Sequence, residues 1–375
     1  MDRCDVVIVG GGPAGSSCAW ALRNSNLDVV VIDKNKFPRD KVCAGWITPM
    51  LIDVLELDIE AYRQQHTFQP IVGFRVGLLG NPMLDIRYGH GVSYGIRRCE
   101  FDDYLLHRSE ARLRLGEPIQ KLTRSQTGWV INDSLQTPMI VGAGGHFCPV
   151  ARYLGADVGR TERAVNAQEC EFEIGPSEQA DYPIEAGIPE LYFCADLKGY
   201  GWCLRKGVFI NIGLGREDNQ GLARHVDSFL DYLAQTGRIP TDIKPRFKGH
   251  AYLLYQHAHR ELVGDGVMLI GDAAGLACTQ SGEGIRPAIE SGLLAAATIL
   301  QADCRYSHAN LEAYINRLTT RFGARDARDW LELMPSSINS RLAVKLLSQH
   351  WFVKHQVLDR WFLRTHEPPL KYGSV

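Results

Sequence analysis

A glycine-rich turn between an apolar strand and a helix carries the clearest chemical signal in the chain. The run Asp5–Gly15 reads as a strand followed by Gly-x-Gly-x-x-Gly, with its glycines at 10, 12 and 15. Gly10 permits a tight turn, Gly12 lets backbone N–H groups approach a pyrophosphate, and Gly15 lets the helix pack on the strand. Asp33 ends the next predicted strand, about 20 residues after the turn, where a carboxylate can accept ribose hydroxyls. Together they predict a bound dinucleotide.

The start of this helix should face the phosphates. Pro13 suits an early helical position, where a missing N–H has no consequence, and Ala14 follows it. Free N–H groups and the positive end of the helix dipole favour an anion there. Asp33 also disfavours a 2′-phosphate, so the tightly held nucleotide should not be NADP. The adjoining Lys34 belongs to the same predicted site.

A second segment, far along the chain, narrows the nucleotide to a flavin. An apolar strand from Val267 ends at Gly271 and Asp272, where a carboxylate can reach ribityl hydroxyls. The small residues that follow leave room for an isoalloxazine ring. A helix then begins in the run Gly282-Glu-Gly284-Ile285, and its N–H groups can face flavin N1 and O2, where negative charge gathers on reduction.

Composition argues against several other classes of protein. The 375 residues allow two joined domains, and a net charge of −2 without a basic stripe argues against a nucleic-acid partner. No Cys-x-x-Cys pair and no His/Cys cluster at zinc spacing occurs, so we expect no metal site. The ten cysteines are scattered, which is typical of a reducing compartment. Met1 leads directly into a buried strand and no apolar run reaches 18 residues, so we expect a cytoplasmic protein.

The order of the predicted elements indicates an α/β fold. A strand–helix–strand unit spans 4–32, alternating segments at 73–79, 83–88 and 91–96 predict antiparallel strands, and helical spacing covers 101–113. Strands at 129–131 and 139–141 return to the nucleotide-binding domain. A second strand-rich block runs from 164 to about 255, followed by the strand at 267–270 and a helix at 285–302.

These elements predict a Rossmann-like FAD-binding domain that is interrupted by an antiparallel β-sheet substrate domain and followed by a helical C-terminal cap. The predicted boundaries are 1–65, 96–160 and 256–330 for the FAD-binding domain, 66–95 and 161–255 for the substrate domain, and 331–375 for the cap. The cap is rich in aromatic residues, at 330, 351, 352, 361 and 362. It either closes the cavity or, with its neighbouring basic residues, rests on a lipid surface.

Four motifs, in order, carry a family resemblance. The first three are Phe37-Pro-Arg39-Asp-Lys41-Val-Cys43-Ala44-Gly45, Arg98-Cys-Glu-Phe-Asp-x-x-Leu105 and Tyr200-Gly-Trp202-Cys-Leu-Arg-Lys-Gly207; the fourth is Gly271-Asp-Ala-Ala-Gly275 with Ser281–Ile285. They resemble the geranylgeranyl-reductase-like branch of the FAD-dependent oxidoreductases that share the p-hydroxybenzoate-hydroxylase fold. The resemblance implies that Arg98 lies against FAD and that Cys43, Ala44 and Gly45 lie beside the flavin ring. We expect Arg39 and Lys41 to lie close to the phosphate end of the bound FAD. They either contact the cofactor or are solvated charges of the loop.

The chain departs from the family pattern at five positions. Gly144 stands where relatives have an acid, Cys148 where they have Ser, and Ala44 where they have Gly. We include Gly144 in the predicted cofactor site. In hydroxylase relatives the acid at this position helps to order transient contacts with the pyridine nucleotide, so its absence weakens the argument for reduction by NAD(P)H. Thr279 and Arg205 replace prolines and are expected to add polar groups to the substrate side.

Three residues are candidates for the chemistry itself. Cys43 beside the ring could donate a proton or only pack. Tyr200 and Trp202 alternate on a strand and so share a face, either the wall of the substrate cavity or ordinary core. His146 follows a glycine-rich turn and is the weaker candidate, because a single loop histidine is usually structural.

The leading prediction is an FAD-dependent oxidoreductase that passes a hydride from reduced, non-covalent FAD to a C=C bond of a small, apolar, isoprenoid-like substrate. No second Gly-x-Gly-x-x-Gly follows a strand, so NADPH or NADH would act as a transient reductant. One alternative is a monooxygenase that hydroxylates an aromatic compound or a side chain of a partner protein. Another is a flavin-binding redox sensor without turnover.

Overall fold

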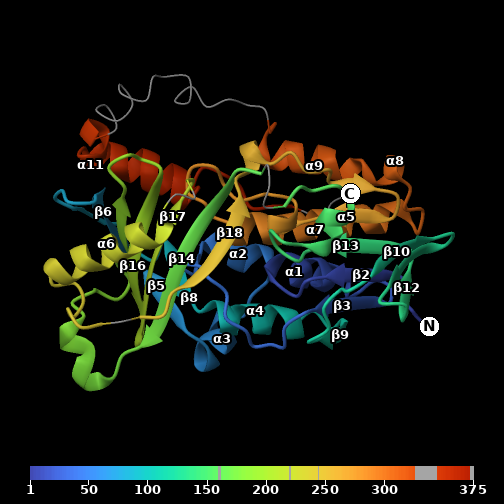
Figure 1. Cartoon of the computed structure of the whole chain (residues 1–375), viewed down its shortest axis with the longest axis horizontal. Coiled ribbons are helices and arrows are strands. Elements are labelled where there is room, and N and C mark those ends of the chain that lie inside the picture. Colours follow the sequence, from blue (N-terminus) through green and yellow to red (C-terminus); the bar gives the residue numbers. More distant parts are fainter. Residues whose placement is uncertain (159–161, 219–220, 244, 326–343, 372–375) are drawn as a thin grey trace.

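The computed structural model of the chain describes residues 1–158, 162–218, 221–243, 245–325 and 344–371 (Figure 1). All ten cysteines lie in these ranges, and each is a free thiol. In the same ranges, no helix combines the length and the apolarity that crossing a bilayer requires.

A six-stranded sheet forms the core of one half of the molecule. In spatial order its strands are β19 (Val263–Gly264), β20 (Val267–Leu269), β13 (Met139–Gly142), β2 (Val6–Val9), β3 (Val29–Asp33) and β9 (Arg112–Leu115). Neighbours run parallel except β19 and β20. β2 and β3 are apolar up to Asp33 because a parallel sheet is buried on both faces. This confirms the predicted Rossmann-like α/β core.

Two helices begin beside this sheet and pack closely on each other. α1 (Pro13–Leu22) follows β2 through the glycine-rich turn, and α7 (Ile285–Ala302) has the predicted bounds. A Cβ at Gly292 of α7 would come within 2.3 Å of the Ala14 carbonyl oxygen, so this glycine allows the close contact. The packing brings the N-terminal ends of both helices to one region of the molecule.

The strand at 129–131 does not join the parallel sheet. It lies in a four-stranded sheet made of β1 (Asp2–Arg3), β12 (Leu135–Thr137), β11 (Gly128–Ile131) and β10 (Leu122–Ser125). Trp129 packs into the main core, and its indole N–H donates to the Gly266 carbonyl oxygen at 2.7 Å. Only β13, of the two predicted returning strands, extends the nucleotide-binding sheet.

A seven-stranded sheet forms the other half of the molecule. Its order is β18 (Lys248–Leu253), β14 (Ala164–Glu173), β17 (Phe209–Arg216), β16 (Gly199–Lys206), β15 (Glu190–Phe193), β6 (Gly73–Leu78) and β7 (Leu84–Arg87). All pairs are antiparallel except β15 with β6. α6 (Leu222–Gln235), which the sequence analysis did not predict, packs Phe229 against Gly201 of β16. Trp202, the next residue, therefore faces the opposite side.

Two further expectations needed correction. The three segments predicted as one run of antiparallel strands divide between sheets, because β8 (Ser93–Ile96) joins β4 (Trp46–Ile47) and β5 (Phe68–Ile71). The helix predicted over 101–113 is α4 (Arg98–His107), which ends six residues earlier than expected. Glu110 then adopts a left-handed φ of 59°, which turns the chain into β9.

Further helices pack around these sheets. They include α2 (Pro49–Val54), α3 (Ile59–Gln65), α5 (Pro149–Tyr153), α8 (His308–Leu311), α9 (Ala313–Phe322), α11 (His350–Phe352), the π-helical η5 (Val353–Phe362) and the 3-10 helices η1 (Pro176–Asp181), η2 (Tyr255–His257) and η3 (Gly271–Ala273). Figure 1 shows α11 near the seven-stranded sheet. Residues of η5, among them Val357 and Phe362, pack against Trp46 and Phe74. The described part of the C-terminal segment is helical, as expected, whereas Trp330 lies outside the described residues.

Candidate functional site

One cavity of about 600 Å³ collects nearly every residue predicted to bind a cofactor or substrate. This volume lies within the range typical of ligand pockets. The predicted residues that line it are Gly10, Gly12, Pro13, Ala14, Asp33, Lys34, Arg39, Lys41, Cys43, Ala44, Gly45, Arg98, Gly144, Tyr200, Trp202, Asp272, Gly282, Gly284 and Ile285. Gly15 and Gly271 are the exceptions.

Gly15 and Gly271 support the wall from behind. A Cβ at Gly15 would lie 1.9 Å from the Gly10 carbonyl oxygen, so only glycine lets α1 approach the turn. Gly271 has a φ of 59°, and a Cβ there would lie 2.9 Å from the Ala14 Cβ. Both glycines therefore fix the position of α1 without contacting the cavity.

The nucleotide end of the cavity has the features that an adenosine diphosphate requires. Asp33 is 8% exposed, and its two carboxylate oxygens accept the N–H groups of Gly11 and Asn35, each at 2.8 Å. A carboxylate keeps further lone pairs for ribose hydroxyls. Gly12 caps α1 with no side chain, so the first N–H groups of the helix remain available for phosphate oxygens. The residues present fit the cofactor.

A buried carboxylate directs two arginines toward this region. Asp102 of α4 is fully buried, and both of its oxygens accept from Arg98 at 2.8 Å. Arg39 Nη1 lies 3.2 Å from the same carboxylate, and Arg39 Nη2 would lie 3.3 Å from a Cβ on Gly12. Because Gly12 lies in the phosphate-binding turn, directly before α1, Arg39 lies at the predicted pyrophosphate end.

Three titratable groups meet at the predicted ribityl end of the cavity. Lys41 is one of them, so it lies in the group around Asp272 and not, as expected from the sequence, near the phosphates. Lys41 Nζ lies 2.6 Å from His250 Nε2, which lies 3.3 Å from Asp272 Oδ2. Burial and the Lys41 charge lower the pKa of His250 to about 4. Burial opposes the charge of Asp272, but the His250 hydrogen bond and the Lys41 charge lower its pKa to about 2. At neutral pH this carboxylate is ionised and can accept hydroxyl protons, as a ribityl contact requires.

Burial also lowers the pKa of Lys41, to about 8, against an ordinary value of 10.5. We therefore expect Lys41 in the FAD-free protein to react with acetic anhydride as a free amine at lower pH than other lysines. Competitive labelling followed by mass spectrometry of the Lys41 peptide should give half-maximal reactivity near pH 8. Half-maximal reactivity near the ordinary lysine pKa of 10.5 would contradict the buried position of Lys41. Added FAD should slow the reaction by covering Lys41.

Aromatic side chains surround the cavity on its substrate side. The Tyr200 ring lies 6.1 Å from Trp202 and 5.5 Å from Phe362 of η5, and Trp46 also lines the wall. Tyr200 donates its hydroxyl to the Ser281 carbonyl oxygen at 2.6 Å, and Trp202 donates to Asn211 Oδ1 at 2.7 Å. Because the polar tips are engaged, this wall offers mainly carbon surface to a ligand.

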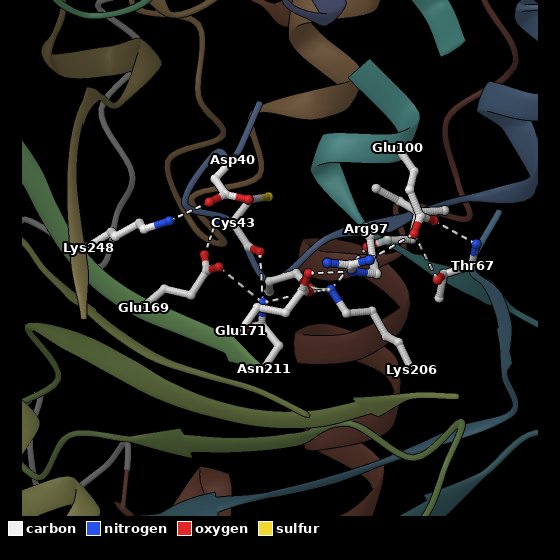
Figure 2. A network of polar contacts seen from close by, with 12 residues as sticks. Asp40, Cys43, Thr67, Arg97, Glu100, Glu169, Glu171, Lys206, Asn211 and Lys248 are labelled. Carbon is white, nitrogen blue, oxygen red and sulfur yellow. Dashed lines mark hydrogen bonds and ion pairs between the residues drawn. The ribbon is translucent and has the colours of Figure 1, made fainter. Parts of the chain in front are cut away.

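The Cys43 loop also contacts a network of polar side chains (Figure 2). The Cys43 N–H donates to Glu169, and the Cys43 carbonyl oxygen accepts from Asn211 at 3.3 Å. Lys206 Nζ holds the next residue by donating to the Ala44 carbonyl oxygen at 3.1 Å. The main chain of this loop is thus anchored from the seven-stranded sheet.

Two departures from the family pattern lie next to each other. A Cβ at Gly144 would lie 3.2 Å from the Cys148 sulfur and 3.3 Å from the Cys148 Cα, so the turn leaves little room for a side chain at 144. The expectation for Thr279 and Arg205 was wrong, because neither lines the cavity. Arg205 instead donates to Gly207 and Gln179.

His146, the weaker candidate of the sequence analysis, lines the cavity but is structurally engaged. It is 2% exposed, and its Nδ1 lies 3.2 Å from Arg260 Nη2, which pairs with Glu162. Burial and the Arg260 charge lower its pKa. Within the described ranges, no cluster of three or more His, Cys, Asp or Glu residues could hold a metal ion.

Sequence reasoning missed several residues of this site. His250 and Tyr252 line the cavity from β18, and Glu169 and Asn211 lie behind it on β14 and β17. The spacing of His250 and Tyr252 on a strand was a usable signal, since alternate residues share a face. Glu169 and Asn211 belong to no local motif of known chemistry.

Known proteins share both the sequence and the fold. A family model described as FAD dependent oxidoreductase matches residues 5–99. A menaquinone reductase of Mycobacterium tuberculosis is 31% identical, over 79% of this chain and 76% of that protein. A digeranylgeranylglycerophospholipid reductase of Methanocaldococcus jannaschii is 26% identical, over 78% and 76%.

Among solved structures, a geranylgeranyl bacteriochlorophyll reductase-like protein of Thermoplasma acidophilum superimposes with a TM-score of 0.79 at 19% identity. The superposition covers 96% of this chain and 97% of that protein, which shows a common fold. The identity and coverage of the mycobacterial relative extend the similarity beyond fold. The chain therefore belongs to the geranylgeranyl-reductase-like family of FAD-dependent oxidoreductases.

Proposed function

We propose that this enzyme reduces a C=C bond of an apolar, isoprenoid-like substrate, with FAD as its cofactor and NADPH or NADH as a transient reductant. The observation that carries the proposal is the continuity of one cavity. Its lining passes from the predicted flavin contacts at Asp272 and Gly284 to the aromatic wall of Tyr200, Trp202 and Phe362. An apolar chain on that wall would lie beside the flavin ring.

The chain's own residues would hold FAD at defined points. Asp33 would accept the ribose hydroxyls, Arg39 and the start of α1 would face the pyrophosphate, and Asp272 would accept the ribityl hydroxyls. The start of α7, at Gly284 and Ile285, would direct N–H groups toward the pyrimidine edge of the ring. Bound FAD, once reduced, supplies a hydride.

Reduction of an alkene also consumes a proton, and Cys43 is the residue proposed to donate it. Cys43 lines the cavity on the loop that is anchored from behind. Tyr200 is less suited, because burial raises its pKa well above its usual value and its hydroxyl is engaged with Ser281. The aromatic wall would orient the substrate and exclude water.

The names of the relatives support a reductase. The relative from Mycobacterium tuberculosis is named a menaquinone reductase, and the relative from Methanocaldococcus jannaschii is named a digeranylgeranylglycerophospholipid reductase. Three sequence features favoured a monooxygenase: the altered motif at Gly144 and the polar residues Thr279 and Arg205. Gly144 lines the cavity, whereas Thr279 and Arg205 do not. The reductase is therefore the proposal favoured here.

The test is anaerobic reoxidation of the reduced enzyme by isoprenoid alkenes, followed through the flavin absorption. We expect a geranylgeranyl compound or a menaquinone to reoxidise the wild type much faster than buffer does. Cys43→Ala should slow this step by at least ~100-fold, the usual minimum for losing a general acid. Cys304→Ala is the control, because Cys304 is an exposed thiol that lines neither the main cavity nor the space behind the loop. A rate equal to that in buffer for all alkenes tested would contradict the proposal.

A further inference from the structure

A small polar space lies behind the Cys43 loop, on the side away from the main cavity. Its volume is about 80 Å³, and it shares Asp40, Lys41, Val42, Cys43 and Arg98 with the main cavity. A cavity of this kind needs about 10–15 Å³ to hold one water molecule, so the space has room for several. Its outer rim carries the ion pair of Asp40 and Lys248, whose side chains are 66% and 57% exposed. The space therefore extends from the Cys43 loop toward solvent.

Glu169 of β14 is the buried acid of this space. It is 7% exposed, and its Oε2 accepts the Cys43 N–H while its Oε1 accepts from Asn211 Nδ2 at 3.2 Å. The indole of Trp202 donates to Asn211 Oδ1, which fixes the amide orientation and directs Nδ2 toward the carboxylates. Glu169 therefore contacts the peptide of the residue that faces the substrate.

The neighbouring carboxylate has a different environment, which Figure 2 shows. Glu171 pairs with Lys206 at 2.5 Å and with Arg97 at 2.9 Å, whereas no described ion pair involves Glu169. Burial therefore raises the pKa of Glu169 to about 7, while the pKa of Glu171 is lowered by Lys206 and Arg97 despite burial. At neutral pH, Glu169 can both hold and release a proton.

The charged and titratable groups around Glu169 come from every element packed on it. They are Glu171 on its own strand, Lys206 at the end of β16, Lys248 on β18, Arg97, Arg98 and Cys99 at the start of α4, Arg246, and Asp40, Lys41 and Cys43 of the loop. Among these groups, the Lys206 charge lowers the pKa of Glu169 most. The Lys206 ammonium is itself held by Glu171 and by the Ala44 and Ile96 carbonyl oxygens.

We propose that Glu169 resupplies the proton that Cys43 gives to the substrate, through water in the space behind the loop. The inference rests on the proposed function. In each turnover one alkene carbon receives the hydride from reduced FAD, and the other receives the proton of the Cys43 thiol, so the C=C bond becomes a C–C single bond. The thiolate then takes a proton relayed from the Glu169 carboxyl, and the carboxylate takes one from bulk water past Asp40 and Lys248. Glu169 acts through Cys43 and does not touch the substrate.

The decisive variant is Glu169→Gln, because its amide oxygen can still accept the Cys43 N–H while the group no longer titrates. We expect continuous turnover of the wild type, with dithionite as reductant and excess alkene, to slow as pH rises through about 7, where the carboxyl loses its proton. In the variant, turnover should be at least ~10-fold slower at pH 6 and nearly independent of pH from 6 to 8, whereas its first reoxidation, which uses the proton already on Cys43, should match the wild type. Reduction of its FAD by dithionite should match the wild type.

Glu171→Gln is the matched control. Glu171 lies in the same cluster as Glu169, but its carboxylate stays ionised at neutral pH because its pKa is lowered. The Glu171→Gln protein should retain the pH dependence, with the inflection moved to lower pH, because the Glu171 charge raises the pKa of Glu169. A purely structural role predicts the opposite order: Glu169→Gln would behave as the wild type, and Glu171→Gln, which loses an ion pair, would be the impaired protein. That order would overturn the proposal.

A second measurement does not depend on turnover. Infrared difference spectra of the wild type should contain a protonated-carboxyl C=O band that disappears as pH rises through about 7, and Glu169→Gln should lack this band. Absence of the band in the wild type at pH 6 would overturn the proposal. If no alkene reoxidises the wild type, the proposed function fails; if the wild type turns over and Glu169→Gln shows the same profile, only the proton supply fails.

Discussion

Gly15→Ala will give a protein that no longer retains FAD. The added Cβ would lie 1.9 Å from the Gly10 carbonyl oxygen and 3.0 Å from Ile8 Cγ2, and the first contact is with main chain that cannot rotate away. α1 must therefore move away from β2, which displaces the N–H groups and the turn that face the pyrophosphate. We expect FAD affinity to fall by at least ~100-fold, which corresponds to about 3 kcal/mol.

The measurement is the dissociation constant of FAD, from quenching of flavin fluorescence, with Gly91→Ala as control. A Cβ at Gly91 would have its nearest neighbour at 3.9 Å, and Gly91 does not line the cavity. The control should bind FAD as the wild type does. Tight FAD binding by Gly15→Ala would mean that α1 does not carry the pyrophosphate.

Asp102→Ala should cause the largest loss of stability among single changes near the site. Asp102 is fully buried and pairs with Arg98 and with Arg39. Removing it leaves the Arg98 guanidinium, which is only 9% exposed, without its partner. Breaking a buried pair from one side costs about 3–5 kcal/mol, so the free energy of unfolding in urea should fall by about that amount.

The next residue provides the control. Asp103 forms an ion pair with His107, and the side chains of Asp103 and His107 are 29% and 59% exposed. Pairs of this kind contribute about 0–1 kcal/mol, so Asp103→Ala should unfold close to the wild-type midpoint. Equal losses in the two variants would show that the Asp102 carboxylate does not organise the arginines. Asp102→Ala should also bind FAD more weakly, because Arg39 loses its anchor.

The cofactor end of the cavity could be predicted from the sequence because its determinants are local. Gly10, Gly12 and Pro13 lie within one strand–turn–helix unit, and Asp33 ends the adjacent strand, so spacing alone brings them together. The same holds for Gly284 and Ile285 at the start of α7. These residues line the cavity as the motifs required, although their contacts to FAD remain predictions.

The substrate side could not be predicted in the same way, because sheet register brings it together. Glu169 of β14 lies beside β17 and β18 through pairings that span about 40 to 80 residues of sequence, which no local motif encodes. Arg205 shows that a motif can also mislead. Its position in a substrate motif predicted a polar cavity wall, but its side chain donates to Gln179 instead. α6 was detectable, since Val226, Phe229 and Leu233 follow helical spacing on its buried face.

The most direct test of the central claim is an anaerobic single turnover in which flavin absorption and product mass are recorded together. The claim is that one cavity brings reduced FAD and an apolar alkene into contact. We predict that each flavin reoxidised yields one product molecule heavier by two hydrogens, with Cys43→Ala slow in both signals. A flavin that stays reduced with every isoprenoid alkene, and is reoxidised only when oxygen enters, would contradict the account.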